Sequence, residues 1–286
     1  MKIIDGYMPF KGLKTYYRIV DGGDKTPLIC LHGGPGSTHN YFEVLDCIAK
    51  TGRKVIMYDQ IGCGKSYVEG HDELWNQETW MEELVALMEY LNIESCHLLG
   101  QSWGGMLAIA YAIEKKNAKL KSLILSSTLS SASLWAKEQH RMIGFMSDDE
   151  QQAISEDYDS IAYQAANEHY MQLHCAGPFD KDTPECVTRE KKAGQRSYLI
   201  GWGPNEYTPL GTLKDFEYTN RLHEIDVPAL IISGTNDLCT PLVAKTMYDG
   251  IKNSKWHLMP ACRHMCFVDD HDTYCQNLKD WLASVE

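Results

Sequence analysis

The segment GQSWGG at residues 100–105 holds the residue of this chain best suited to covalent chemistry, Ser102. The segment directly follows an apolar run that predicts a strand, and it directly precedes a helical pattern. In the G-x-S-x-G pattern at such a turn, the glycines allow a tight bend that presents a strained serine at the end of the strand. We therefore predict that Ser102 is a nucleophile. The alternative is a glycine- and serine-rich turn without chemistry.

A nucleophilic serine needs a base, and the base needs an acid that orients it. Asp237 follows the apolar run PALIIS at residues 228–233, at the end of a later predicted strand. His264 lies in the loop between the last predicted strand and the last predicted helix, which gives the chain order Ser, Asp, His of the α/β hydrolases. His271 is the alternative base, but it falls at the start of the closing helix, where a capping or solvated role is expected. We expect Asp237 and His264 to complete a triad with Ser102.

A hydrolytic serine also needs two backbone N–H groups that bind the oxyanion of the tetrahedral intermediate. Trp103, the residue after the nucleophile, offers one of them. The loop HGGPG at residues 32–36 follows an earlier apolar run, and its glycines let backbone amides approach a reacting carbonyl. This loop predicts the second donor.

Motifs that suggest nucleotide or metal binding lack required residues. DQIGCGKS at residues 59–66 follows a predicted strand and ends in GKS, but a P-loop needs glycine where Asp59 stands. The chain has no H-E-x-x-H and no C-x-x-C pairs, and Cys262, His264 and Cys266 do not have an established ligand spacing. We predict no metal and no cofactor.

The elements that would position these residues alternate along the chain. Apolar runs predict strands at 27–32, 54–59, 96–100, 121–126, 228–233 and 255–259, and helical spacing predicts helices at 41–51, 77–91, 103–114 and 269–283. This alternation predicts a mostly parallel sheet with helices on both faces. Helical and irregular patterns interrupt it, so the predicted domains are an α/β core at residues 1–129 and 218–286 and a helical insertion at 130–217.

Composition excludes several classes of protein. The 286 residues are 44% hydrophobic and 23% charged, as in a globular chain. With 39 acidic and 27 basic residues the net charge is −12, which repels phosphate backbones, so we predict no nucleic-acid partner. We find no apolar run long enough for a signal peptide or a membrane span. The ten cysteines, several of them in strand-like runs, are expected to be reduced thiols of a cytoplasmic protein.

Over nearly its whole length the chain resembles the proline iminopeptidases, which are aminopeptidases of the α/β-hydrolase superfamily. The resemblance rests on HGGPG, DQIGCGKS and GQSWGG, and on residues 234–241 followed by His264. It implies an α/β-hydrolase fold in which the insertion is a cap that closes over the site and recognises the N-terminal residue of the substrate. The site residues that it implies are the nucleophile Ser102, the acid Asp237, the base His264, and Gly34 and Trp103 as the oxyanion hole.

The resemblance also implies how the free amine of the substrate is bound. Family members hold the α-ammonium with cap and loop carboxylates, one of them in a G-x-x-E-[FY] segment that GPNEY at residues 203–207 matches. Glu206 is therefore the expected amine anchor, and the alternative is a surface glutamate in a turn. Members often carry a second glutamate directly after the catalytic aspartate, where this chain has Leu238.

The expected function is that of a serine aminopeptidase that releases an N-terminal residue, preferentially proline, from short peptides through an acyl-enzyme. An amino-acid amidase or a small-molecule esterase or lactonase on the same triad is the first alternative, which Leu238 favours. A non-catalytic ligand receptor is the second, against which the intact set of serine, aspartate and histidine argues. The expected partner is a short peptide or an amino-acid amide, with no nucleic acid and no membrane.

Overall fold

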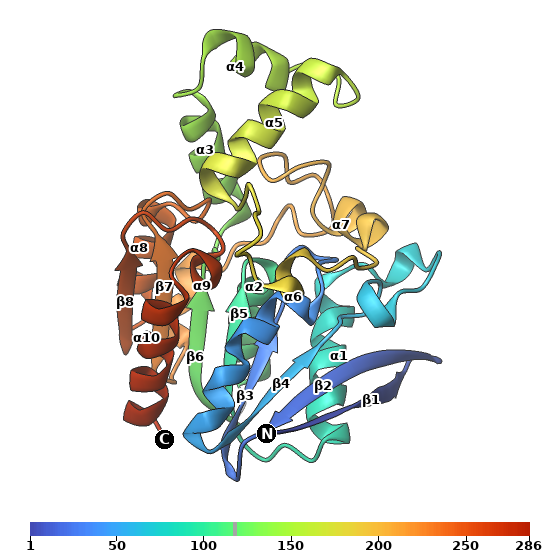
Figure 1. The fold of residues 1–286 in the computed structure, drawn as a ribbon, viewed down its shortest axis with the longest axis vertical. Coiled ribbons are helices and arrows are strands. Elements are labelled where there is room, and N and C mark those ends of the chain that lie inside the picture. The colour runs from blue at the N-terminus through green and yellow to red at the C-terminus, as the bar shows by residue number, and fades with distance from the viewer. Residues whose placement is uncertain (117–118) are drawn as a thin grey trace.

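Eight strands form one sheet in the computed structural model, which describes residues 1–116 and 119–286 (Figure 1). The order across the sheet is β1-β2-β4-β3-β5-β6-β7-β8. The strands that run parallel are β3 (Lys25–Leu31), β4 (Arg53–Tyr58), β5 (Cys96–Gln101), β6 (Leu120–Ser126), β7 (Ala229–Gly234) and β8 (Ser254–Met259). Their bounds lie within two residues of the six predicted strands, and the predicted, mostly parallel α/β architecture is confirmed.

The first two strands are not predicted by the apolar runs of the sequence. β1 (Lys2–Phe10) and β2 (Leu13–Asp21) pair in an antiparallel hairpin, and β2 pairs antiparallel with β4. Lys11 and Gly12 between them have positive φ angles of 48° and 78°, the geometry that suits a two-residue hairpin turn. β1 is an edge strand with most side chains exposed or half-buried, so its sequence does not show the apolar run of a buried parallel strand.

Helices cover both faces of the sheet, and each face has its own core. One face packs on α1 (Gln77–Tyr90), α2 (Trp103–Lys115) and α8 (Pro241–Gly250), and the other on the 3₁₀ helix η1 (His39–Thr51) and α10 (His271–Ser284). Alternate side chains of β3 divide between the two cores: Ile29 and Leu31 belong to the first, and Leu28 and Cys30 to the second. Among the residues with assigned structure, no helix combines the length and the apolar character that crossing a membrane requires.

Shorter helices lie in the loops that connect these elements. They are η2 (Gly64–Ser66), η3 (Asp72–Leu74), η4 (Thr219–Glu224) and α9 (Cys266–Asp269). The predicted closing helix at 269–283 begins two residues later, because Asp270 is the N-cap of α10 and its side chain accepts the Thr273 N–H.

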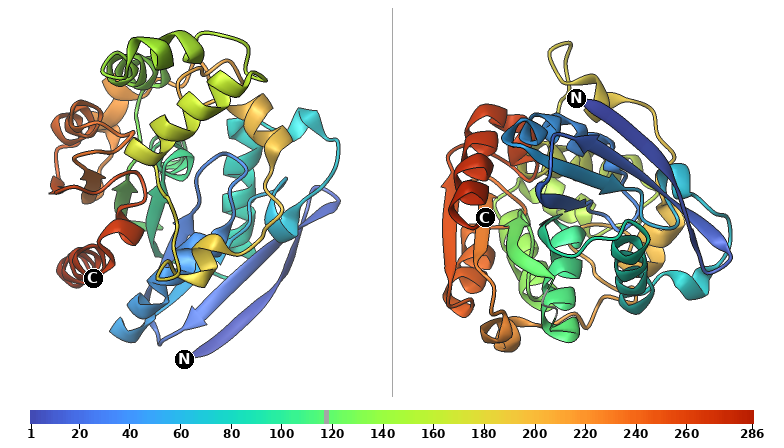
Figure 2. Two further views of the ribbon diagram at one scale, coloured as in Figure 1. Left: turned by 45° about the horizontal axis from the view of Figure 1, so that its top comes forward. Right: turned by 90° about the horizontal axis from the view of Figure 1, so that it is seen from below.

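The segment at residues 130–217, between β6 and β7, carries helices and no strand within the described part of the chain. Its helices are α3 (Ala132–Ile143), α4 (Asp148–Ile154), α5 (Ile161–His174), α6 (Glu185–Thr188) and α7 (Gln195–Gly201). In Figures 1 and 2, α3, α4 and α5 lie beyond one end of the sheet. The two ends of the segment pair with each other through an antiparallel bridge between Ser131 and Glu217. This bridge brings the beginning and the end of the segment together.

The motif at residues 59–66 is a buried turn built around Asp59. The Asp59 carboxylate accepts the His39 N–H through Oδ1 and the Lys65 N–H through Oδ2, both at 2.8 Å. The Ser66 hydroxyl donates to the Asp59 carbonyl at 2.6 Å. A Cβ on Gly64 would lie 2.2 Å from Asp59 Oδ2, so glycine is required there. The motif therefore shapes the loop after β4, because Asp59 forms its hydrogen bonds with His39, Lys65 and Ser66 of the same protein.

Candidate active site

The turn between β5 and α2 holds Ser102 in a strained conformation. Its φ of 56° and ψ of −126° lie in a region that non-glycine residues rarely adopt. The neighbouring glycines make the turn possible, because a Cβ on Gly100 would lie 2.2 Å from the Gly104 carbonyl oxygen, and one on Gly104 would lie 2.0 Å from the Leu31 carbonyl oxygen. The predicted elbow geometry is therefore present at this turn.

Asp237 lies in the loop after β7, where its carboxylate oxygens accept four hydrogen bonds. Oδ1 accepts the Cys239 N–H at 2.8 Å and lies 2.8 Å from His264 Nδ1. Oδ2 accepts the Ser127 hydroxyl at 2.6 Å and the Gly234 N–H at 3.1 Å. Because the carboxylate is buried and fully hydrogen-bonded, its orientation toward the imidazole is fixed.

His264 lies between β8 and α9, and its surroundings hold the ring in place. The Trp135 ring from α3 makes an edge contact with the imidazole, with centroids 5.8 Å apart. The His264 N–H donates to the His174 carbonyl at 3.0 Å, and the His264 carbonyl accepts the Gln101 side chain at 3.4 Å. A carboxylate on Nδ1 leaves Nε2 as the nitrogen that can accept a proton.

Ser102 and His264 line the same cavity, whose volume is about 580 Å³. No hydrogen bond joins the two side chains in the described part of the chain. Catalytic hydrogen bonds often tighten only when a substrate is bound, so a longer separation does not exclude proton transfer between them.

Two backbone N–H groups near Ser102 are available as donors. Among the described residues, neither the Trp103 N–H nor the Gly34 N–H has a hydrogen-bond partner within the protein. Trp103 is the first residue of α2, where an N–H has no acceptor inside the helix. Gly34 has a φ of 110°, and a Cβ there would lie 2.5 Å from the Gly36 nitrogen. Both predicted oxyanion donors are thus unpaired.

A hydrogen-bonded chain that the sequence analysis does not identify links three loops of the site. The Gly33 N–H donates to the Tyr41 hydroxyl at 2.6 Å, and this hydroxyl donates to Gln101 Oε1 at 2.8 Å. Gln101 then reaches the His264 carbonyl. Tyr41 and Gln101 therefore hold the HGGPG loop, the elbow and the histidine loop together. Tyr41 has no motif around it, and only the G-x-S-x-G segment points to Gln101.

The histidine of the HGGPG loop is structural. His32 Nε2 accepts the Gln60 N–H at 3.0 Å, and the Gln60 side-chain amide donates to the His32 carbonyl at 2.9 Å. Gln60 Oε1 in turn accepts the Trp103 indole N–H at 2.8 Å. Burial lowers the pKa of His32 to about 4, so the ring is neutral at pH 7.

Glu206 lies in the turn after α7, where it lines the cavity. The Tyr198 hydroxyl donates to Glu206 Oε1 at 2.8 Å, and the Glu206 carbonyl accepts the Trp135 indole N–H at 2.9 Å. Burial raises the pKa of the Glu206 carboxyl, although His264 and Tyr198 oppose this rise. Of the described residues that line the cavity, Glu206 is the single Asp or Glu, and Lys191 is the single Lys or Arg.

Leu238 does not contribute to the cavity. Its side chain is fully buried in the core on the α8 face of the sheet, and it is absent from the described residues that line the cavity. The loop bearing Leu238 is tied to the helices above it, because the Leu238 N–H donates to the His174 carbonyl and its carbonyl accepts the Gln139 side chain.

The described residues contain two groups of side chains whose donor atoms are close enough to hold a metal ion. In the first, His32, Asp59 and Cys63, hydrogen bonds within the protein already use His32 and Asp59, so no free donor set faces a cation. The second comprises Cys47 and Cys275 together with His271, the alternative base of the sequence analysis. His271 has these thiols and the Val44 carbonyl as neighbours. It is Asp237 that pairs with His264.

Comparisons with known proteins agree with this architecture. The alpha/beta hydrolase fold family matches residues 26–271. A proline iminopeptidase of Clostridioides difficile is 58% identical to this chain, with 99% of each protein covered. A proline iminopeptidase of Lactiplantibacillus plantarum is 53% identical, with 97% of this chain and 99% of that protein covered. The crystal structure of a Mycobacterium smegmatis proline iminopeptidase superposes with a TM-score of 0.87 at 28% identity, over 98% of both chains.

Proposed function

The chain belongs to the proline iminopeptidases of the α/β-hydrolase fold, and on this basis we propose that Ser102, His264 and Asp237 release the N-terminal proline of peptides. The observation that carries the proposal is the Asp237–His264 contact at 2.8 Å, beside a strained serine in the same cavity.

The reaction follows from the roles that these positions permit. Ser102 Oγ attacks the carbonyl carbon of the first residue while His264 Nε2 takes the hydroxyl proton. The N–H groups of Trp103 and Gly34 stabilise the oxyanion. His264 then gives the proton to the leaving amine, and an acyl-enzyme remains on Ser102. Water attacks this ester by the same route in reverse, which releases proline and restores the serine.

We propose that residues 130–217 act as a cap that limits the enzyme to the N-terminal residue. Two contacts support this role. The carbonyl of His174, the last residue of α5, accepts N–H groups from both Leu238 and His264, so the cap is joined to the loops that carry the acid and the base. Trp135 of α3 contacts the His264 ring and also binds the Glu206 backbone. Glu206 thereby lines the same cavity as Ser102 and His264.

Glu206 is proposed as the anchor of the substrate's ammonium group. A carboxylate that burial makes costly to ionise gains most from a cation that enters its pocket. A neutral N-acyl group offers no such charge and leaves the carboxylate unpaired, so the pocket discriminates against it.

The Glu206→Gln variant is expected to raise KM for a prolyl arylamide by roughly 30-fold, the equivalent of about 2 kcal/mol for a charged hydrogen bond. Its kcat should change little, since the triad is untouched. N-acetylprolyl arylamide should be a poor substrate for both proteins. Glu168→Gln, which removes a charge from the exposed surface of α5, is the matched control. Equal rates on the free and the acetylated substrate in the wild type would contradict the anchor.

The Glu206 carboxyl is expected to make KM depend on pH, and the direction of its pKa shift gives the sign of this dependence. Its pKa is raised in the folded enzyme, so on acidification Glu206 takes up a proton at a higher pH than an ordinary glutamate and loses the charge that binds the ammonium. KM should therefore rise as the pH falls through this raised pKa, and the rise should be absent from the Glu206→Gln variant.

Lys191 supports a preference for short peptides. It lines the cavity in the chain between α6 and α7, and its ammonium donates to the Val187 carbonyl at 3.1 Å. No carboxylate within the described residues forms an ion pair with it, and burial lowers its pKa. Such a cation is suited to the carboxylate at the C-terminus of a dipeptide or tripeptide whose ammonium is bound by Glu206.

We expect the Lys191→Met variant to lower kcat/KM about tenfold for a prolyl dipeptide with a free carboxylate. Activity on the corresponding dipeptide amide and on prolyl arylamide should change less than twofold, because neither carries a charge at that end. Lys192→Met removes the same charge at the next position, which is not a cavity residue. Equal losses on the acid and the amide would rule out the carboxylate contact.

We propose a cytoplasmic location from the chemistry of the cysteines. All ten are free thiols, and several are fully buried in the two cores. A chain that keeps this many thiols reduced suits a reducing compartment.

A further inference from the structure

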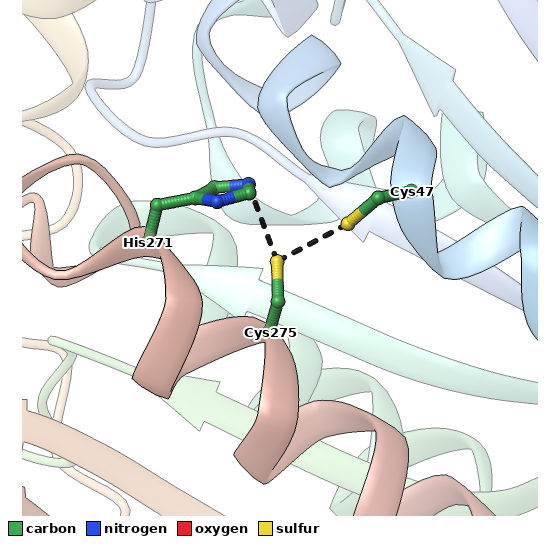
Figure 3. Close-up of side chains that lie close together, drawn as sticks. All are labelled: Cys47, His271 and Cys275. Carbon is green, nitrogen blue, oxygen red and sulfur yellow. Dashed lines mark hydrogen bonds between the residues drawn. The ribbon is translucent and has the colours of Figure 1, made fainter.

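Two cysteines that are distant in the sequence meet on the η1 and α10 face of the sheet (Figure 3). Cys47 belongs to η1 and Cys275 to α10, and their sulfur atoms are 3.3 Å apart. His271 lies one turn before Cys275 on α10, with its Nε2 atom 3.3 Å from the Cys275 sulfur. A disulfide has an S–S distance of about 2.05 Å, so closing this pair requires an approach of about 1.3 Å.

The surroundings of His271 place a proton on Nε2. This atom lies 2.9 Å from the Val44 carbonyl oxygen, which can only accept a hydrogen bond. Nδ1 lies 3.5 Å from a carboxylate oxygen of Asp272. Burial opposes a charged ring, but the Val44 carbonyl and Asp272 outweigh it and raise the pKa of His271. The Nε2 proton also faces the Cys275 sulfur at 3.3 Å, and a hydrogen-bond donor beside the sulfur pair stabilises a thiolate.

The two thiols are not equivalent. Cys47 is half-buried, whereas the side chain of Cys275 is almost completely buried. The pKa of Cys47 is lowered to about 6, chiefly by the hydrogen bond between its sulfur and that of Cys275. Burial opposes this effect, and His271 and Lys279 add positive charge. Conversely, the pKa of Cys275 is raised by that contact with Cys47 and by its own burial. Cys47 is therefore the accessible nucleophile, and Cys275 is a protonated thiol directly behind it.

We propose that Cys47 and Cys275 form a site of reversible oxidation by hydroperoxides. The Cys47 thiolate attacks the terminal peroxide oxygen, the O–O bond breaks, and the alkoxide or hydroxide that leaves takes up a proton. The Cys275 sulfur then attacks the resulting Cys47 sulfenic acid, the S–O bond breaks, and water leaves with the Cys275 proton. Overall, two thiols and one hydroperoxide give one disulfide, one alcohol or water, and one further water.

The same three side chains are also a donor set for a thiophilic metal such as zinc, since their donor atoms lie within 4.8 Å of one another. The geometry favours oxidation instead. Nε2 of His271 faces the sulfur and the Val44 carbonyl together, so the nitrogen that would have to bind the metal carries a proton. Metal binding is therefore an outcome that the experiment must separate from disulfide formation.

The bond is expected to stabilise the fold and to leave the active site in place. η1 and α10 already pack in one core, so the bridge closes within an existing contact. Tyr41, which links the loops of the active site, lies near the start of η1, and Cys47 lies in its second half. The Tyr41 hydroxyl is held by the Gly33 N–H and Gln101, which the bond between the two sulfurs does not involve. We expect kcat/KM to stay within twofold and the midpoint of thermal unfolding to rise by about 5 °C, because the bridge restricts the unfolded chain.

The test uses the full chain, reduced and then treated with one equivalent of hydrogen peroxide. Free-thiol titration should show a loss of two thiols that dithiothreitol reverses, and peptide mass spectrometry should find Cys47 linked to Cys275. Cys275→Ser should leave a sulfenic acid on Cys47 that dimedone labels, whereas Cys47→Ser should give neither product. His271→Asn should slow the oxidation about tenfold. Cys186→Ser, which replaces another half-buried cysteine, is the matched control.

Two results would overturn the proposal. The first is a disulfide elsewhere, for example between Cys262 and Cys266, with Cys47 still reduced. The second is a dithiol that resists peroxide but binds one equivalent of zinc in the wild type, with the zinc lost in the Cys47→Ser and His271→Asn variants. Activity on prolyl arylamide is measured in parallel, and it reports on the proposed function independently of either result.

Discussion

Ser102→Ala is expected to lower kcat for prolyl arylamide by about 10⁶-fold, the loss seen when a serine nucleophile is removed from a complete triad. Asp237, His264 and the two backbone donors would remain, but no atom would be left to form the acyl-enzyme. The measurement is steady-state hydrolysis over long incubations, combined with labelling by a fluorophosphonate. The wild type should be labelled at Ser102, and the variant should not be labelled.

The strained backbone at Ser102 provides a matched control for folding. Alanine keeps the side-chain constraint at a φ of 56°, so the thermal stability of Ser102→Ala should equal that of the wild type. Ser102→Gly should be equally inactive but more stable by about 1 kcal/mol, because glycine relieves the strain. An active Ser102→Ala variant would show that the nucleophile lies elsewhere. A folded wild type that the fluorophosphonate does not label would instead favour the receptor alternative.

Local patterns were sufficient to predict the parallel part of the fold. Strands that are buried on both faces are rich in apolar residues, as β7 (ALIISG) is, so each shows as a short apolar run bounded by turns. The β1–β2 hairpin lies at the edge of the sheet with one face toward water, and its side chains alternate instead. A prediction that depends on continuous apolar runs therefore misses it.

The site residues that the sequence predicted share one property: each follows a predicted strand or lies in a recognisable motif. The loop after each parallel strand opens at the same edge of the sheet, which is why Asp237 contacts His264 and why Ser102 and His264 line one cavity. Tyr41 and Ser127 could not be found in this way. Tyr41 lies in a helix, and its role arises only when that helix packs beside the elbow. Ser127 follows β6, but it bears a hydroxyl that donates to the Asp237 carboxylate, and no motif marks such a hydroxyl in the sequence.

Lys191 shows a different limit of prediction from sequence. Its chemistry is ordinary, and the segment around it has no pattern that separates it from the adjacent Lys192. Only the folded chain distinguishes the two lysines, because one lines the cavity and the other contacts the Tyr67 ring. Glu206, in contrast, lies in a segment that matches a family motif. The family pattern also distinguishes Leu238, whose side chain is in the core.

Asp237→Asn is expected to lower kcat/KM by about 10⁴-fold while the protein still folds. The carboxylate accepts hydrogen bonds on both oxygens, and an amide has only one acceptor oxygen to replace them. If the amide NH₂ takes the Oδ1 position, it faces the Cys239 N–H and pushes the proton of His264 from Nδ1 to Nε2, the nitrogen that must accept the serine proton. If it takes the Oδ2 position, it faces the Gly234 N–H.

Either orientation of the amide therefore lowers the activity or the stability of the variant. The first removes the base and leaves the Cys239 N–H unpaired, and the second leaves the Gly234 N–H unpaired. An unpaired buried donor destabilises the fold by about 1 to 3 kcal/mol. The measurements are kcat/KM, thermal unfolding, and the pH profile, which separates loss of the base from loss of stability. Asp226→Asn, on the exposed surface before β7, should match the wild type in all three. Ser127→Ala removes only one of the donors to Oδ2, so its loss of activity should be about tenfold. If Asp237→Asn retained activity within tenfold of the wild type, Asp237 would not be the residue that orients His264.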